Sequence, residues 1–136
     1  MKYLCLICAE KVMEQMPEAD AERHFQEYAE FTESVKKSGH FIGANRLQPA
    51  DTATTIRVRN GKVSVTDGPF AETKEQFGGY YLIEAKDLNE AIQVAARIPG
   101  ARLGCVELRP VAEDAQTLAL GLDVPHTARS PGERRE

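Results

Sequence analysis

Three side chains in this sequence have the types and spacing for proton-transfer chemistry: the carboxylate of Asp67 and, four positions apart, His24 and Tyr28. Asp67 directly precedes Gly68-Pro69, which predicts a stiff turn, because glycine tolerates a positive φ and proline fixes its own φ. A carboxylate held at such a turn could serve as an acid, a base or a ligand anchor. A structural role is the alternative: in an Asx-turn the carboxylate accepts a backbone N–H two residues further on.

His24 and Tyr28 lie about one helical turn apart, so their side chains can sit next to each other. A histidine at the edge of an apolar stripe could titrate near neutrality as a general acid or base. Both residues also have a plainer interpretation, a histidine resting on the core edge and a core tyrosine with a satisfied hydroxyl. We expect Asp67 at the rim of a pocket lined by this helix, with His24 or Tyr28 as its partner and the Phe70 ring buried to anchor the turn.

The sequence predicts no metal or cofactor. Its histidines are scattered, and Cys5 and Cys8, although spaced as CxxC, lie in an expected strand and so point to opposite faces. We therefore expect three thiols, with neither a metal nor a disulfide. No phosphate-binding glycine loop or GxSxG motif is present, which favours proton transfer over covalent catalysis.

Length, composition and charge limit the class of protein. The 136 residues suit a single domain, with 42% hydrophobic and 28% charged residues. A net charge of -4 argues against a general nucleic-acid-binding surface, and no apolar run approaches the ~20 residues of a membrane span. The N-terminus lacks a signal-peptide pattern, and an odd number of cysteines fits a reducing compartment. We expect a cytoplasmic protein without nucleic-acid or membrane partners.

Hydrophobic periodicity predicts four single strands, one β-hairpin and two helices. Asn60-Gly61 is the preferred pair for a type I′ hairpin turn, which would set Val58 against Val63 and Ile56 against Val65. Asp87 and Glu90 form a helix-capping pattern. The expected elements are strands at about 2–9, 41–47, the hairpin ending at 67, 79–85 and 103–109, with helices at about 21–38 and 87–98.

The two helices are expected to be amphipathic. The buried stripe predicted for the first helix consists of Ala21, Phe25, Tyr28, Thr32 and Val35, and that of the second consists of Leu88, Ala91, Ile92 and Ala95.

This order of elements predicts an α+β, ferredoxin-like sandwich with an extended β-hairpin and two helices on one sheet face. The first strand is nevertheless apolar on both sides. A second copy of the chain is the simplest cover for the other face, so we expect a homodimer formed by sheet faces.

The run from Thr66 to Tyr81, which contains Asp67-Gly68-Pro69-Phe70, resembles the signature of the YCII-related proteins called the DGPF family. The resemblance covers about residues 2–111 and implies a dimeric α/β barrel with an Asp and a His in its site. By position, the residue matching the family histidine looks more like Tyr28 than His24. We expect a domain at 1–111 and a partly disordered tail at 112–136.

Two functions follow from these observations. One is an enzyme that uses Asp67 for metal-independent acid/base chemistry on a small polar molecule, with His24 or Tyr28 as partner. The other is a ligand-binding or regulatory module. DGPF proteins resemble a group often encoded beside extracytoplasmic-function sigma factors, which implies such a sigma factor as a partner. Fold alone does not decide between the two.

Overall fold

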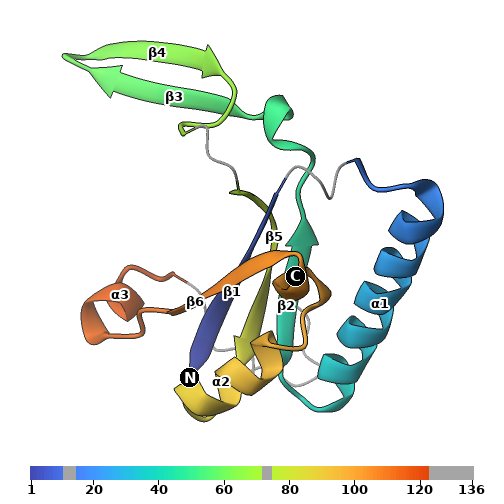
Figure 1. Cartoon of the computed structure of the whole chain (residues 1–136). Helices are drawn as coiled ribbons and strands as arrows, with labels where there is room; N and C mark the ends of the chain where they lie inside the picture. Colours follow the sequence, from blue (N-terminus) through green and yellow to red (C-terminus); the bar gives the residue numbers. More distant parts are fainter. Residues whose placement is uncertain (11–14, 72–74, 123–136) are drawn as a thin grey trace, which may run out of the picture.

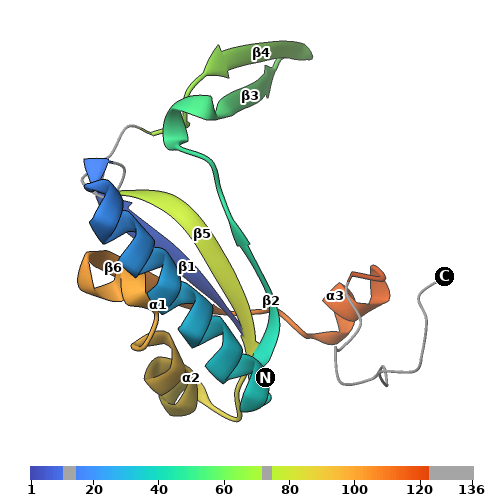
Figure 2. The ribbon, with the colours of Figure 1, turned by 90° about the vertical axis from the view of Figure 1, so that its right-hand side faces the viewer.

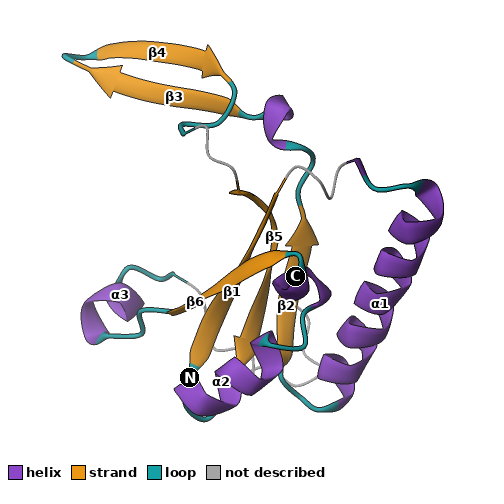
Figure 3. Ribbon diagram, viewed as in Figure 1, coloured by secondary structure: helices purple, strands orange, loops and turns teal. Residues whose placement is uncertain are grey.

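The computed structural model describes residues 1–10, 15–71 and 75–122. Its main body is a four-stranded antiparallel sheet in the order β2-β5-β1-β6, with two helices packed on it (Figure 3). This is the predicted ferredoxin-like α+β plan. The body consists of β1 (Lys2–Glu10), α1 (Glu18–Lys37), β2 (Phe41–Arg46), β5 (Glu75–Glu84), α2 (Leu88–Ala95) and β6 (Gly104–Pro110).

Short helices complete the described chain: η2 (Ala50–Thr52), η3 (Pro99–Arg102) and α3 (Ala115–Ala119). Asp87 caps α2 as predicted, because its carboxylate accepts the backbone N–H of Glu90 at 2.9 Å. Residues 72–74 and the part of the predicted tail beyond residue 122 lie outside the described residues. No helix in the described ranges is long and apolar enough to cross a membrane.

The predicted hairpin forms a separate two-stranded sheet of β3 (Thr54–Arg59) and β4 (Lys62–Asp67). We call residues 54–67 the arm. It projects beyond the end of the main sheet (Figure 1). Ile56 pairs with Val65 and Val58 with Val63, as the Asn60-Gly61 turn predicted, and both turn residues have positive φ.

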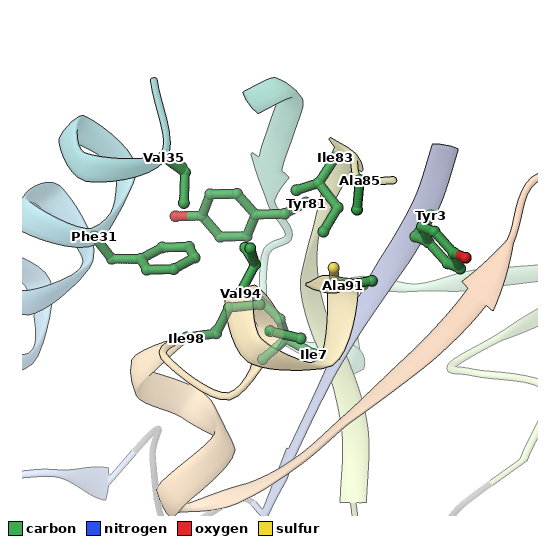
Figure 4. Close-up of a cluster of buried hydrophobic side chains, with 12 residues drawn as sticks. Tyr3, Ile7, Phe31, Val35, Tyr81, Ile83, Ala85, Ala91, Val94 and Ile98 are labelled. Atoms are coloured by element: carbon green, nitrogen blue, oxygen red, sulfur yellow. The ribbon is translucent and has the colours of Figure 1, made fainter. Parts of the chain in front are cut away.

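The core lies between the two helices and one face of the main sheet (Figure 4). Tyr81 of β5 is at its centre, since its ring meets Phe31 edge-on at 5.1 Å between centroids and its hydroxyl lies 2.6 Å from Thr32 Oγ1. The other buried members are Tyr3, Cys5, Ile7, Val35, Ile83, Ala85, Ala91, Val94, Ala95 and Ile98. Cys5 faces this core while Cys8 is on the opposite side of β1, as predicted.

Both predicted helix stripes need correction. On α1 the side facing the sheet runs through His24, Tyr28, Phe31 and Val35, whereas Phe25 is 64% exposed. Each step along a helix turns the side chain by about 100°, so a line through position 24 leaves position 25 in solvent. On α2 the alanines and Val94 face the core because small side chains allow close approach, while Leu88 and Ile92 remain about half exposed.

The helices α1 and α2 lie on the same face of the sheet (Figure 2), which confirms the predicted layering. Leu4, Leu6 and Cys8 of β1 are on the opposite face, together with their β5 neighbours Tyr80 and Leu82. We call this set the open face. Its members are half-buried in the single chain, and the arm extends over this side of the molecule (Figure 2).

Candidate functional site

The Gly68-Pro69 turn closes the base of the arm. Gly68 has a φ of +100°, a conformation that side chains rarely adopt. Its N–H donates to the carbonyl of Ala53 at 2.7 Å, and its own carbonyl accepts the hydroxyl of Thr55 at 2.7 Å. The turn is therefore tied to the start of β3 and to the residue that precedes this strand.

The Asp67 side chain is exposed, and it has no hydrogen-bond or ion-pair partner among the described residues. An Asx-turn to the residue two positions on was wrong, because that residue is Pro69, which has no N–H. The expectation for Phe70 was also wrong. Its ring is 77% exposed, since the arm stands away from the core and offers nothing to pack against.

His24 and Tyr28 do meet on α1. Their rings lie 5.0 Å apart between centroids and are almost perpendicular, at 88°. The imidazole Nδ1 lies 3.7 Å from Oε1 of Glu27. The other nitrogen, Nε2, is buried and has no hydrogen-bond partner among the described residues. His24 thus holds an unused donor or acceptor beside Tyr28.

Tyr28 is bound into the fold through its hydroxyl. The N–H of Gly100 in η3 donates to Tyr28 Oη at 3.0 Å, and burial raises the pKa of Tyr28 to about 12. A Cβ on Gly100 would lie 2.5 Å from this oxygen and 2.9 Å from Ile7, so the close approach requires glycine. These contacts give Tyr28 a packing role in this chain.

Charged residues surround the α1–η3 seam. Arg102 donates to Glu27 at 2.7 Å, and this hydrogen bond is the main reason that the pKa of Glu27 is lowered. Arg97 donates to the Ser34 hydroxyl at 3.2 Å. An open hollow of about 290 Å³ lies here, lined by Glu27, Glu30, Phe31, Ser34, Arg97, Pro99 and Arg102. Sequence reasoning missed these residues, because Glu27 and Arg102 are 75 positions apart and only the fold brings them together.

The three predicted site residues occupy two separate places. His24 and Tyr28 lie on α1 in the body, and Asp67 lies at the end of β4 in the arm (Figure 1). Among the described residues no hydrogen bond, ion pair or ring contact joins Asp67 to either of them. The same part of the chain contains no group of three or more His, Cys, Asp or Glu residues that could hold a metal ion.

A family model of the YCII-related domain matches residues 1–114. The chain belongs to the YCII-related domain family. An uncharacterized protein of Rhizobium meliloti (strain 1021) is 35% identical to this YCII-related chain over 105 residues, which are 76% of this chain and 85% of the relative. The finer likeness to the DGPF group stays a prediction.

A solved structure similar to this YCII-related chain is 5-chloro-2-hydroxyhydroquinone dehydrochlorinase of Burkholderia phenoliruptrix AC1100, in complex with 2,5-dihydroxybenzoquinone. The similarity covers 85% of this chain and 98% of that one, with a TM-score of 0.45 and 12% sequence identity.

The raised pKa of Tyr28 predicts a loss of stability in alkali. Unfolded Tyr28 releases its proton near the ordinary value of 10.0, whereas the folded form keeps it until about 12. The contribution of this shift to the free energy of unfolding is therefore complete below pH 10 and is lost as the pH rises toward 12. Cys5 and Tyr81, whose pKa values burial also raises, act in the same direction, so the Tyr28 share must be isolated by substitution.

We expect Tyr28→Phe to lower the free energy of unfolding by about 1–3 kcal/mol at neutral pH, because the buried N–H of Gly100 loses its acceptor. Between pH 10 and about pH 12 the stability of this variant should fall less steeply than that of the wild type. Urea denaturation followed by circular dichroism measures both quantities. Parallel pH curves for the two proteins would contradict the assignment.

Proposed function

We propose that this YCII-related chain is a binding or regulatory module that works as a cytoplasmic homodimer. The exposed apolar face of the arm is the observation that carries the proposal. Its four aliphatic side chains are 56–68% exposed, namely Ile56, Val58, Val63 and Val65. Clustered apolar side chains on a projecting element are typical of surfaces that bind another macromolecule.

The second copy belongs on the open face. Because α1 and α2 cover only one side of the sheet, apolar side chains on the other side are left partly exposed, and a symmetric partner is the common solution. Leu4 and Leu6 present aliphatic surface there, next to Tyr80 and Leu82. Two copies stacked on this face would form the barrel that the family resemblance implies.

The arm then provides a surface for a different protein. Its polar face carries Arg57, Arg59 and Lys62, and residues 54–66 contain no carboxylate, although the whole chain has a net charge of -4. An acidic protein surface with an apolar centre would therefore complement the arm. The DGPF resemblance makes an extracytoplasmic-function sigma factor the partner to test first.

Acid/base catalysis on a small polar molecule is the second candidate, and His24 is the observation in its favour. A buried imidazole nitrogen that finds no hydrogen-bond partner in the described part of the chain lowers stability, and such groups often belong to functional sites. In this candidate His24 is the base, Asp67 approaches by movement of the arm or from a second copy, and Tyr28 holds the imidazole in place.

We expect the wild type to sediment as a dimer at micromolar concentration. Leu6→Glu should weaken the dimer about 100-fold or more, because it would bury an unpaired charge in the interface. Ala29→Glu on the exposed side of α1 is the matched control and should leave the dimer intact. A monomeric wild type, or a folded Leu6→Glu protein that remains dimeric, would rule out the open face as the interface.

For the arm, we expect Val58→Thr together with Val63→Thr to reduce the affinity for a purified extracytoplasmic-function sigma factor at least tenfold. Threonine keeps the shape and β-propensity of valine but adds a hydroxyl, so the unfolding free energy should change by less than about 0.5 kcal/mol at these exposed sites. Ser64→Ala on the polar face is the control, and fluorescence anisotropy is the measurement. Unchanged affinity in the double variant would refute the arm as the contact.

The second candidate predicts a different pattern in a thermal-shift screen of small organic acids, alcohols and phenols. A compound that raises the Tm of the wild type should have no effect on His24→Gln or Asp67→Asn. His40→Gln and Asp51→Asn are matched controls elsewhere in the chain and should respond like the wild type. A stabilising compound that acts equally on all four variants would remove Asp67 and His24 from the binding site.

A further inference from the structure

Cys8 and Cys105 face each other across two neighbouring strands. Cys8 lies on β1 and Cys105 on β6, and the antiparallel register makes them direct partners. Both are thiols in this structure, one half-buried and the other exposed. They are 97 positions apart in the sequence, so only the pairing of the first and last strands of the sheet brings them together.

We propose that Cys8 and Cys105 form a peroxide-oxidisable dithiol that closes to a disulfide within one chain. Directly opposed residues on antiparallel strands have Cα atoms about 4.5–5.5 Å apart. Disulfides span Cα separations of about 4.4–6.8 Å, so the backbone need not move far. The two thiols lie on the open face, which the proposed homodimer also uses, but their pairing depends on strand register within one chain and not on that assembly.

The expected bond is strained and therefore reversible. Side chains directly opposed on a sheet have Cβ atoms about 4.5–5.5 Å apart, whereas a disulfide draws them to about 3.5–4.5 Å. Closing the bond must pull β1 and β6 together locally. Strained disulfides are reduced more readily than relaxed ones, which is typical of responsive rather than structural bonds.

The chemistry balances with hydrogen peroxide as the oxidant. The Cys105 thiolate, on the exposed side chain, attacks one peroxide oxygen, so that an S–O bond forms, the O–O bond breaks and water leaves after protonation. The Cys8 thiolate then attacks this sulfur, an S–S bond forms, and the sulfenic oxygen leaves as a second water. The two thiols lose two electrons and two protons, and the peroxide is reduced.

Cys5 provides an internal control. It is fully buried in the core on the other face of β1, and burial raises the pKa of its thiol to about 12. Because the thiolate is the reactive form, Cys5 should not react with peroxide while the chain is folded.

The test treats the full-length chain with a small excess of hydrogen peroxide, blocks remaining thiols with N-ethylmaleimide, and maps non-reduced peptides by mass spectrometry. We expect a Cys8–Cys105 linked peptide from a single chain, with a mass loss of about 2 Da that dithiothreitol reverses. Cys5 should be labelled only after unfolding.

Three cysteine variants test which thiols form the link. Cys5→Ala should still form the link, whereas Cys8→Ser and Cys105→Ser should each abolish it while keeping the far-ultraviolet circular dichroism of the folded chain. The wild-type peptide map decides the question even if a variant fails to fold. A Cys105–Cys105 link between chains, oxidation of Cys105 to sulfinic acid without a Cys8 link, or no reaction at all would each overturn the proposal.

Discussion

The packing of Tyr81 against α1 is the interaction on which the rest of the body depends. Its hydroxyl lies 2.6 Å from Thr32, and three other aromatic rings surround it, from Phe31 at 5.1 Å to Tyr28 at 6.5 Å. Because Tyr81 is on β5, these contacts fix how α1 crosses the sheet. That crossing turns His24 inward and leaves Phe25 in water, and it brings the hydroxyl of Tyr28 to η3.

The features of the fold that could be predicted from the sequence depend mostly on residues that are close together in the chain. Strand and helix order, the Asn60-Gly61 hairpin register and the Asp87 cap each depend on residues close in sequence, so their patterns are readable. The buried faces of the helices were harder to predict, because small or polar residues such as Ala91 and His24 face the sheet while larger apolar neighbours remain exposed. Only the crossing at Tyr81 decides which line faces the sheet.

The candidate site was harder to predict for a different reason. The contact between His24 and Tyr28 follows from helical spacing and was found. Two other contacts join segments more than 70 residues apart, namely Glu27 with Arg102 and Tyr28 with Gly100. A pattern of hydrophobic residues along the chain does not predict such contacts. Asp67 is separated from α1 because the arm projects away from the body. Amino-acid composition does not show in which direction a hairpin projects.

The position of β1 in the middle of the sheet has a consequence for synthesis on the ribosome. β1 pairs with β5 and with β6, and the β6 partners extend to Pro110. The arm, whose strands are joined by a two-residue turn, can form as soon as it emerges. By contrast, the edge of β1 that pairs with β6 stays unpaired until nearly all of the domain has been translated. During that interval its apolar sides and unpaired backbone are open to other chains, so the nascent protein is most prone to misassociation before β6 arrives.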